Sequence, residues 1–312
     1  MTAEQETRRF GLPPRDFRGY GGAPLDPAWP GGARLAVSLV VNVEEGAELS
    51  LADGDESSES VHEVVDDVAG APDLLMESHF EYGTRAAYWR LADLLDRYGV
   101  KATFSASARS LERSPWLARD IRARGHEISA HSYRWERHAH MAEDDERAVV
   151  ARTVAAIREA AGVRPVGWHT RSASSPNTRR LLVEEGGFLY DSDAYDDDLP
   201  YVVEVDGRAH VVLPYAFDTN DMRFYRQLGF TLGEDFRTYC TDAFDWLHGE
   251  GGKMMSIGLH LRIIGRPGRI GALDRLLATM TGRGGVWFAT RAEIAHHWRD
   301  RVGLAPFAPA TS

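Results

Sequence analysis

The longest apolar run of the chain predicts a buried central β-strand. Residues 34–46 read Arg-Leu-Ala-Val-Ser-Leu-Val-Val-Asn-Val-Glu-Glu-Gly, and the run is rich in β-branched residues and nearly uninterrupted. Such a run is typical of a parallel strand that is covered on both faces. It ends at Asn42, and Glu44 and Glu45 follow where the strand leaves the core. Ligands bind at this end of the strands in α/β folds, although carboxylates are also common at a solvated strand end.

From residue 83 onward, helical and strand patterns alternate regularly. Glycines close several helical segments, as at Gly99, Gly125 and Gly162. Asp206-Gly207 between valine-rich arms predicts a β-hairpin over 201–214. Six further strands are predicted, at 101–106, 126–132, 165–170, 188–191, 253–261 and 286–290. The predicted helices cover 88–98, 111–124, 143–161, 176–186, 235–248, 270–281 and 291–301.

Seven strands that alternate with helices predict an α/β fold, a distorted (β/α) barrel of about seven parallel strands. We expect a single domain over residues 34–301. Residues 1–33, of which 11–33 are rich in glycine and proline and carry aromatic side chains, are predicted to form an arm packed on that domain. Residues 47–82 are acidic and lack clear periodicity, which predicts a loop or lid, with disorder as the alternative. Residues 302–312 are expected to form a loose tail.

Composition limits the partners and the compartment. The chain has 312 residues, 43% of them hydrophobic, and a formal net charge of −11. The acidic balance argues against nucleic acid or an anionic membrane as partner and favours a small-molecule substrate. Cys240 is the only cysteine, which excludes an internal disulfide and a thiolate metal cluster. Neither an export signal nor a membrane-spanning run is visible, so we expect a cytoplasmic protein.

Polar side chains follow several predicted strands at their carboxyl ends. They are Glu44, Glu45, His131, His169, Arg171, Asp191, Asp193 and His260. One histidine at a strand end is more often structural than catalytic, but several acids and bases at equivalent ends predict an active site. A carboxylate whose pKa is raised by a like-charged neighbour can act as general base, and a histidine opposite can protonate a leaving nitrogen. The predicted chemistry is hydrolysis, without a serine nucleophile because no Gly-x-Ser-x-Gly motif is present.

Seven blocks of sequence together carry a family resemblance. The blocks are Asn42 to Gly46, His131 to Glu136, Gly167 to Arg171, Ser175 to Arg180, Tyr190 to Asp193, Asp218 to Asp221 and Gly258 to His260. In this order they resemble the polysaccharide deacetylase (NodB homology) superfamily and, more closely, its branch of metal-independent allantoinases. The resemblance implies a distorted barrel that hydrolyses the C–N bond of an amide or cyclic amide. It also implies a homo-oligomer, with a tetramer as the expected form.

The resemblance also bears on the cofactor. In the typical deacetylase, one aspartate of the first motif is the base, and the next binds a metal with two histidines of a His-x-x-x-His motif. Glu44 and Glu45 stand at the aspartate positions, His131 at the first histidine and Trp135 at the second. Because an indole has no lone pair for a metal, we expect no cofactor. The alternative is a divalent metal such as zinc, with His169 as third ligand beside Glu45 and His131.

The resemblance implies a role for each candidate residue. Glu44, with Glu45 beside it, would activate water, His131 and Arg171 would polarise the carbonyl, and His260 would protonate the departing nitrogen. The segment 168–176 is one residue longer than in the allantoinases, which leaves the role of Arg171 open. The candidate substrate-binding residues are Trp135, Trp168, His169, Arg171, Asn220 and Asp221. Packing of the two tryptophans in the core and a turn at Asn220-Asp221 are the alternatives.

Three functions are therefore compared. The leading hypothesis is a hydrolase that opens a small cyclic amide, ureide or imide, with allantoin as the named candidate and activity that survives a chelator. The second is a metal-dependent N-deacetylase of an acetylated sugar or amine, which should contain stoichiometric zinc. The third is a catalytically inactive binding module, whose function would survive replacement of Glu44 by Gln.

Overall fold

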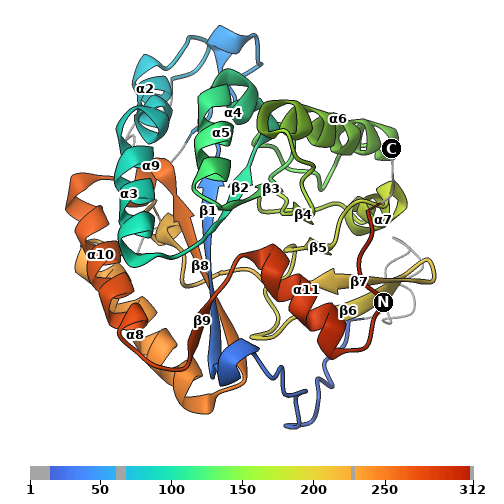
Figure 1. Ribbon diagram of the computed structural model, residues 1–312. Helices are drawn as coiled ribbons and strands as arrows, with labels where there is room; N and C mark the ends of the chain where they lie inside the picture. The colour runs from blue at the N-terminus through green and yellow to red at the C-terminus, as the bar shows by residue number, and fades with distance from the viewer. Residues whose placement is uncertain (1–14, 61–67, 226–228, 310–312) are drawn as a thin grey trace.

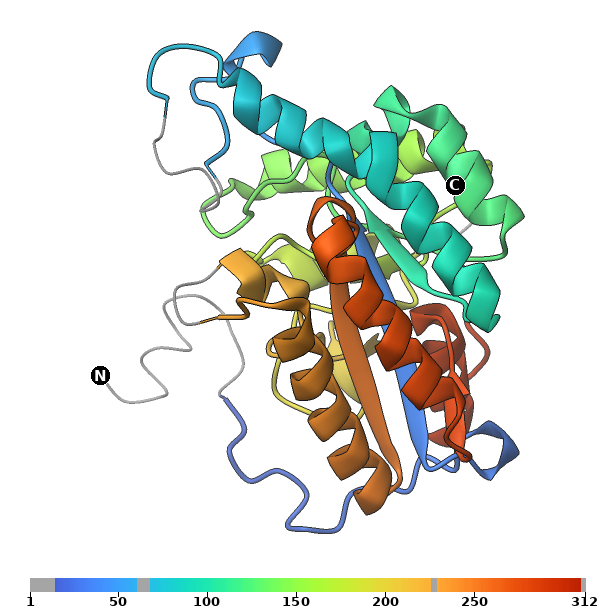
Figure 2. The ribbon, with the colours of Figure 1, turned by 90° about the vertical axis from the view of Figure 1, so that its left-hand side faces the viewer.

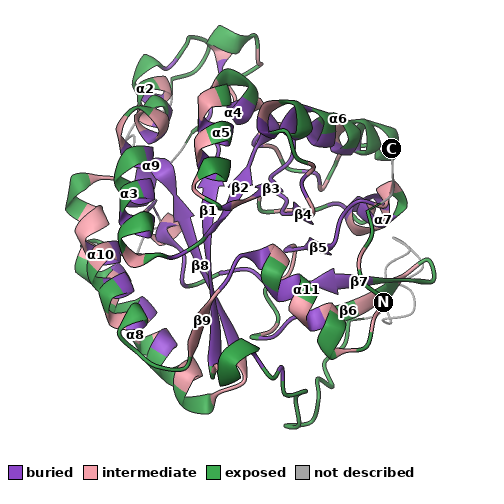
Figure 3. Cartoon of the chain, viewed as in Figure 1, coloured by how far each residue is buried: buried purple, intermediate pink, exposed green. Residues whose placement is uncertain are grey.

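Strand β1 (Leu35–Val43) is the most heavily paired strand of the sheet. The computed structural model describes residues 15–60, 68–225 and 229–309. All nine residues of β1 are buried, and the strand pairs in parallel with β2, β8 and β9 (Figure 3). The structure therefore confirms the predicted burial of this apolar run on both faces.

The described residues form one nine-stranded sheet that curls into a half-barrel (Figure 1). Its spatial order is β6-β7-β5-β4-β3-β2-β1-β8, with β9 paired to β1, and only the β6–β7 pair is antiparallel. The other strands are β2 (Thr103–Ala106), β3 (Glu127–Ala130), β4 (Gly167–Trp168), β5 (Tyr190–Asp191), β6 (Tyr201–Val205), β7 (Arg208–Val212), β8 (Lys253–His260) and β9 (Val286–Phe288). The predicted α/β fold and its seven parallel strands are confirmed.

The predicted hairpin is β6–β7. Asp206 and Gly207 turn the chain with positive φ angles of 49° and 72°, the backbone that a two-residue turn between right-twisted strands needs. Strand β7 then joins β5 in parallel and extends the sheet.

Most helices cover the outer face of the curled sheet, whereas the last helix, over 291–301, packs on its inner face (Figures 1 and 2). The helices are α2 (Leu74–Tyr82), α3 (Tyr88–Tyr98), α4 (Ala108–Arg113), α5 (Pro115–Ala123), α6 (Glu143–Ala161), α7 (Thr178–Glu185), α8 (Gly233–Glu250), α9 (Leu261–Ile264), α10 (Pro267–Thr281) and α11 (Arg291–Arg301). Short 3₁₀ turns occupy η1 (Pro30–Gly32), η2 (Leu51–Asp53) and η4 (Asp221–Tyr225), and η3 (Gly83–Ala87) is a π-helical turn that joins α2 to α3. In the described part of the chain, none of the helices has the length and apolar character needed to cross a membrane.

Two helical predictions need correction. The helix expected over 111–124 is split into α4 and α5 at Ser114, whose φ and ψ of −131° and 66° are not helical. Pro115 causes this break, because a proline disfavours the helical conformation of the residue before it and fits the first position of the next helix. In the same way, α10 begins at Pro267, three residues earlier than predicted.

The N-terminal arm packs on the sheet through one aromatic side chain in particular. Trp29 is buried, packs at a tilt against Trp287 and donates its indole N–H to the Lys253 carbonyl. By contrast, Phe17 is 82% exposed, so the predicted packing of the arm does not extend to this end of it. The first 14 residues of the arm lie outside the described residues.

The segment over 47–82 is more ordered than its sequence pattern indicated. Its last nine residues form α2, which begins at Asp73 with a side-chain cap to the backbone N–H groups of Leu75 and Met76. Residues 61–67 of this segment lie outside the described part of the chain.

Candidate active site

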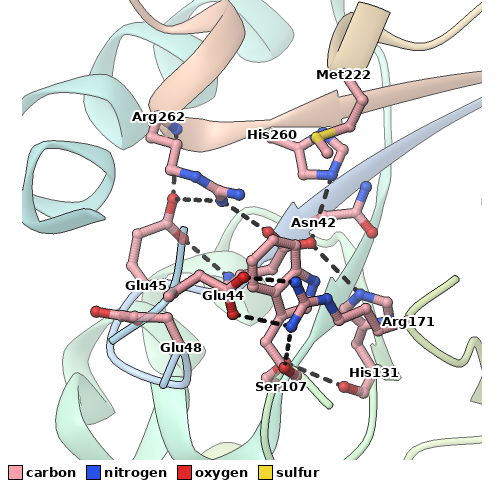
Figure 4. A network of polar contacts seen from close by, with 12 residues as sticks. Asn42, Glu44, Glu45, Glu48, Ser107, His131, Arg171, Met222, His260 and Arg262 are labelled. Carbon is pink, nitrogen blue, oxygen red and sulfur yellow. Dashed lines mark hydrogen bonds and ion pairs between the residues drawn. The ribbon is translucent and has the colours of Figure 1, made fainter. Parts of the chain in front are cut away.

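Glu44 and Glu45 immediately follow β1, and their side chains point to different sides (Figure 4). Glu44 is buried and lines a cavity of about 200 Å³ together with His131 and His260. Glu45 is also buried but lines a separate acidic cavity. Both residues lie past the end of β1, in a turn closed by a hydrogen bond from Ala47 N to the Glu44 carbonyl, so the alternation of side chains along a strand does not decide which of them faces the cavity.

Two histidines converge on one oxygen of Glu44. His131 follows β3 and His260 ends β8, where it lies opposite Asn42 of β1. The Nε2 atoms of both rings lie 3.4 Å from Glu44 Oε1. Of the residues predicted to be catalytic, Glu44, His131 and His260 therefore meet at the carboxyl ends of separate strands, whereas Glu45 does not join them (Figure 4).

Each histidine ring is oriented by a hydrogen bond at Nδ1, the ring nitrogen that does not face Glu44. The Nδ1 of His260 lies 2.6 Å from Asp221 Oδ1, and the His260 backbone N–H donates to the other oxygen of Asp221. The Nδ1–H of His131 donates to the His169 carbonyl at 2.6 Å. Both hydrogen bonds leave Nε2 as the atom that faces Glu44 and the cavity.

Arg262 is a part of the site that the sequence analysis missed. Its side chain is fully buried, and one guanidinium nitrogen donates to Glu44 Oε2 at 2.7 Å and lies 3.8 Å from Glu45 Oε1. The only signal in the sequence was its position two residues after His260, in an otherwise apolar stretch.

Electrostatics correct the predicted state of the base. Burial opposes ionisation of Glu44, but Arg262 and His260 outweigh it and hold the pKa of Glu44 well below its ordinary value. Burial, together with the neighbouring Glu44 carboxylate, instead raises the pKa of Glu45. Burial also disfavours the charged form of His260, yet Glu44 and Asp221 outweigh it and raise its pKa to about 9. At neutral pH the site thus pairs an ionised Glu44 with a protonated His260.

Glu45 is held by backbone N–H groups. Its Oε2 accepts from Glu44 N at 2.9 Å and its Oε1 from Arg262 N at 3.3 Å. The π-helical turn η3 passes so close that a Cβ atom on Gly83 would lie 2.2 Å from Glu45 Oε1. Only glycine can occupy this position without moving the carboxylate.

Trp135, His169 and Arg171 line the cavity with Glu44. The Arg171 guanidinium lies 3.4 Å from the Trp135 ring centroid, donates to the Trp135 carbonyl and forms a double ion pair with Glu59. The ring of His169 stacks on that of His131, with a centroid separation of 4.8 Å. Burial lowers the pKa of His169 well below its ordinary value, so its ring is neutral.

Trp168 does not face the cavity, which corrects its prediction as a substrate-binding residue. It is fully buried, packs edge-on against Phe188 and donates its indole N–H to Thr170. Its position inside β4 directs the ring into the core, as the alternative of core packing foresaw. Among the two tryptophans, only Trp135 contacts the cavity.

Asn220 and Asp221 differ in their position relative to the cavity. Asn220 lines the cavity, while its side-chain oxygen accepts from Met222 N and its side-chain nitrogen donates to the Ala216 carbonyl. Asp221 is fully buried behind His260 and is not among the residues that line the cavity. The geometry therefore makes Asp221 a partner of His260 rather than a contact for substrate.

Asp191 and Asp193 were expected beside Glu44 at the carboxyl ends of the strands, but their side chains bond to residues outside the cavity. Asp191 pairs with Arg179 and His210, and Asp193 caps the backbone and hydroxyl of Thr170. Neither lines the cavity that contains Glu44.

Asn42 is a second residue that the analysis missed. Its amide nitrogen donates to the Leu259 carbonyl, which can only accept, so the orientation of the amide is fixed. Its Oδ1 and the Nδ1 of His169 are buried atoms of cavity-lining residues, and within the described residues neither has a hydrogen-bond partner. A ligand with polar edges could satisfy both.

The donors around Glu45 and His131 do not fit a divalent metal. Within the described ranges, no group of three His, Cys, Asp or Glu side chains is placed to hold one. Both Glu45 oxygens already accept backbone N–H groups, and Arg262 supplies a cation beside them. His169 cannot complete the set with His131, since stacked rings 22° from parallel cannot aim in-plane lone pairs at one ion. The expected alternative of a zinc site therefore finds no support in this donor set.

Comparison with known proteins identifies the family. A family model described as polysaccharide deacetylase matches residues 72–190. A putative polysaccharide deacetylase of Schizosaccharomyces pombe is 37% identical over 91% of this chain and 96% of its own length. The crystal structure of a PuuE allantoinase is 45% identical, covers 93% of this chain and 98% of its own, and superposes with a TM-score of 0.89. That of a probable polysaccharide deacetylase from Pseudomonas aeruginosa is 47% identical, with coverages of 92% and 98% and a TM-score of 0.88.

Fold, site and relatives together define a hydrolase of carbon–nitrogen bonds other than peptide bonds, built on a curled parallel sheet. The chain belongs to the polysaccharide deacetylase family.

Proposed function

We propose that the protein opens the ring of a small cyclic amide, ureide or imide by hydrolysis, with allantoin as the first candidate substrate. The observation that carries this proposal is the meeting of Glu44, His131 and His260 at a cavity of about 200 Å³. This volume lies below the usual range for drug-sized ligands and suits a small heterocycle.

The wall of the cavity supports a flat ligand with N–H and C=O edges. Asn42 Oδ1 is a fixed acceptor without a partner in the described part of the chain, so it can accept a ring N–H. Within the described residues, three of the five N–H donors of Arg171 are used in contacts with Glu59 and Trp135, which leaves two for a carbonyl oxygen. The face of Trp135 offers an apolar surface for the ring.

In the proposed mechanism, Glu44 Oε1 takes a proton from water while the water oxygen attacks the carbonyl carbon. The tetrahedral intermediate collapses by breaking the C–N bond, and His260 Nε2 gives its proton to the departing nitrogen. The two groups are coupled: once His260 has lost its proton, its charge no longer lowers the pKa of Glu44. After the product leaves, the proton moves from Glu44 Oε1 to His260 Nε2, 3.4 Å away, because the attraction between the two charges favours the ionised pair.

The other candidate residues hold or orient the groups that react. His131 presents Nε2 toward Glu44, where it can hold the attacking water, and Arg171 can polarise the carbonyl. Asp221 keeps His260 in the orientation that directs its proton to the cavity. Glu45 has no direct contact with the cavity in this proposal and anchors the turn that carries Glu44.

Glu59 connects the segment over 47–82 to the active site. It belongs to this segment and forms the double ion pair with Arg171 at the cavity wall. We propose that the described first part of this segment, residues 47–60, closes one side of the site, as a lid would.

The comparisons support the proposal without deciding the substrate. The PuuE structure bears the name allantoinase, whereas the Schizosaccharomyces pombe and Pseudomonas aeruginosa relatives bear the name polysaccharide deacetylase. An N-deacetylase therefore remains the second candidate, and the relatives' names are the observation in its favour.

A substrate panel distinguishes these functions. The purified protein is assayed with allantoin, other cyclic ureides and imides, and N-acetylated sugars and amines, each with and without chelator, and its metal content is measured. Ring opening that survives the chelator supports the proposal. Release of acetate that the chelator abolishes would replace it with deacetylation. Binding of a ring without turnover, unaffected by Glu44→Gln, would indicate an inactive binding module.

The same material tests two further expectations. Its oligomeric state in solution, expected to be a homo-oligomer and by resemblance a tetramer, is measurable by light scattering. Fractionation of the source cells tests the expected cytoplasmic location.

A further inference from the structure

Arg262 is the least expected charge in the protein. Its side chain is fully buried and lies beside the rings of Phe80 and Trp135, at 4.3 and 5.2 Å from their centroids. It contacts Glu44 Oε2 at 2.7 Å and lies 3.8 Å from Glu45 Oε1 (Figure 4). One guanidinium thus stands between two neighbouring carboxylates.

The hydrogen bonds of Arg262 indicate that its charge matters more than its donors. Within the described residues, Nε and Nη2 are buried without a hydrogen-bond partner. A buried cation with unused donors is costly unless strong electrostatic attraction compensates, and the adjacent carboxylates supply that attraction. Conversely, two carboxylates buried side by side need a cation close to both if either is to stay ionised.

Arg262 also controls the geometry of Glu44. By binding Oε2 it fixes the carboxylate so that Oε1 is the oxygen presented to His131 and His260. The two oxygens therefore have separate tasks, one toward Arg262 and one toward the cavity.

We propose that Arg262 is the fixed cation of this site, a positioning residue that holds Glu44 ionised and aimed at the cavity and that keeps a divalent metal from binding at the carboxylate pair. Its catalytic consequence rests on the proposed function, whereas the exclusion of metal does not. The exclusion follows from charge and space, because the guanidinium and the Trp135 ring fill the surroundings of the carboxylates.

The first test concerns positioning. Arg262→Met should lower kcat by about 100-fold or more with little change in KM, and Arg262→Lys should recover part of the loss. Loss of the cation raises the pKa of Glu44, so the acid limb of kcat/KM should move to higher pH in Arg262→Met. Arg179→Lys, at a buried ion pair outside the cavity, is the control and should keep the wild-type profile. An unchanged kcat and acid limb in folded Arg262→Met would overturn the positioning role.

The second test needs no substrate. Cobalt(II) and zinc binding are measured by absorption spectroscopy and calorimetry for the wild type, Trp135→His, and Trp135→His with Arg262→Gln. The double variant should gain a metal site, while Trp135→His alone should bind at least tenfold more weakly. Equal binding by the single and double variants, or no binding by a folded double variant, contradicts the exclusion of metal by Arg262. Circular dichroism and thermal melting establish that each variant is folded, so failure of the proposed reaction leaves this result intact.

Discussion

Glu44 and Asp191 are two buried carboxylates that each contact an arginine and at least one histidine, but they differ in how their oxygens are bonded and in their access to the cavity. Glu44 follows β1 and is approached by His260 and Arg262, whereas Asp191 ends β5 and is approached by His210 and Arg179. Each carboxylate is 1% exposed. The sequence offered both as candidates for the same active site.

The difference lies in how completely their oxygens are bonded. Asp191 Oδ1 accepts from Arg179 and from Asp193 N, and its Oδ2 accepts from Arg179 and His210, all at 2.7 to 3.1 Å. Glu44 Oε2 is bonded to Arg262, but among the described residues its Oε1 has only the two histidine nitrogens at 3.4 Å, which is long for a hydrogen bond. Glu44 also borders the cavity. An incompletely bonded oxygen beside open space can accept a proton from water, whereas a fully bonded one stabilises the fold.

The pKa alone would not separate these two sites. Burial opposes ionisation of both groups, and an arginine and a histidine outweigh it and lower the pKa of both Glu44 and Asp191. Structural ion-pair networks perturb the pKa as active sites do, so geometry and access decide function.

The strongest test of the comparison replaces each carboxylate by its amide. Glu44→Gln should lower kcat by about 100-fold to 10,000-fold because the general base is lost. Asp191→Asn should retain kcat but lower the free energy of unfolding by about 3–5 kcal/mol, since it leaves Arg179 and His210 without a full partner. Kinetics and urea denaturation measure both effects. An active Glu44→Gln, or an Asp191→Asn with normal stability and lost activity, would reverse the two assignments.

The histidines provide the second matched pair. His260→Gln should lower kcat by about 100-fold because no acid protonates the departing nitrogen. His210→Gln should change kcat little, because its partner Asp191 lies outside the cavity. Steady-state kinetics with a substrate carrying a better leaving group provides a control, since the defect of His260→Gln should shrink with it. A defect of equal size for both substrates would argue against His260 as the acid.

The pH profile sharpens the role of Asp221. His260 must be protonated to act as acid, so kcat/KM should fall as the pH rises through about 9, the pKa that Glu44 and Asp221 impose against burial. Asp221→Asn removes one of these charges and should move the alkaline limb to lower pH by about 1–3 units. Asp245→Asn, at an exposed ion pair with Arg283, should leave the limb in place. If the alkaline limb of kcat/KM does not move in Asp221→Asn, Asp221 does not raise the pKa of the general acid His260.

Protonation of His260 should also make the stability of the folded protein depend on pH. Because the folded pKa of His260 lies above the ordinary value of 6.5, its contribution to stability is complete below that value and is lost as the pH rises through about 9. Thermal melting of the wild type should therefore show a larger loss between pH 7 and 10 than that of His260→Gln. Parallel melting curves for the two proteins over this range would contradict the raised pKa.

The smallest effects are expected for the tryptophans. Trp135→Phe should raise KM by about tenfold or less, because it reshapes the wall of the cavity. Trp168→Phe should leave KM unchanged and lower stability by about 1–3 kcal/mol through poorer packing and the lost bond to Thr170. Kinetics and denaturation of both variants check this difference, and a raised KM in Trp168→Phe would place that ring nearer to the ligand than the structure does.

Local sequence signals predicted most of the fold. The apolar run before Asn42, the Asp206-Gly207 turn and the helix at 143–161 were recognisable because strand burial, turn conformation and helix periodicity depend on neighbouring residues. The break before Pro115 also depends on a local signal, the proline itself. The ends of parallel strands meet at one edge, so the approach of Glu44, His131 and His260 could be anticipated from their positions.

The sequence by itself thus determined which strands form the sheet and at which edge the acids and bases gather. Only the tertiary structure decided that Glu44 rather than Glu45 faces the cavity, that Trp168 and Asp191 serve the fold, and that Arg262 pairs with a carboxylate 218 residues away. The physical reason is that backbone conformation follows from near neighbours, whereas the bonding state of a buried charge depends on every segment packed around it.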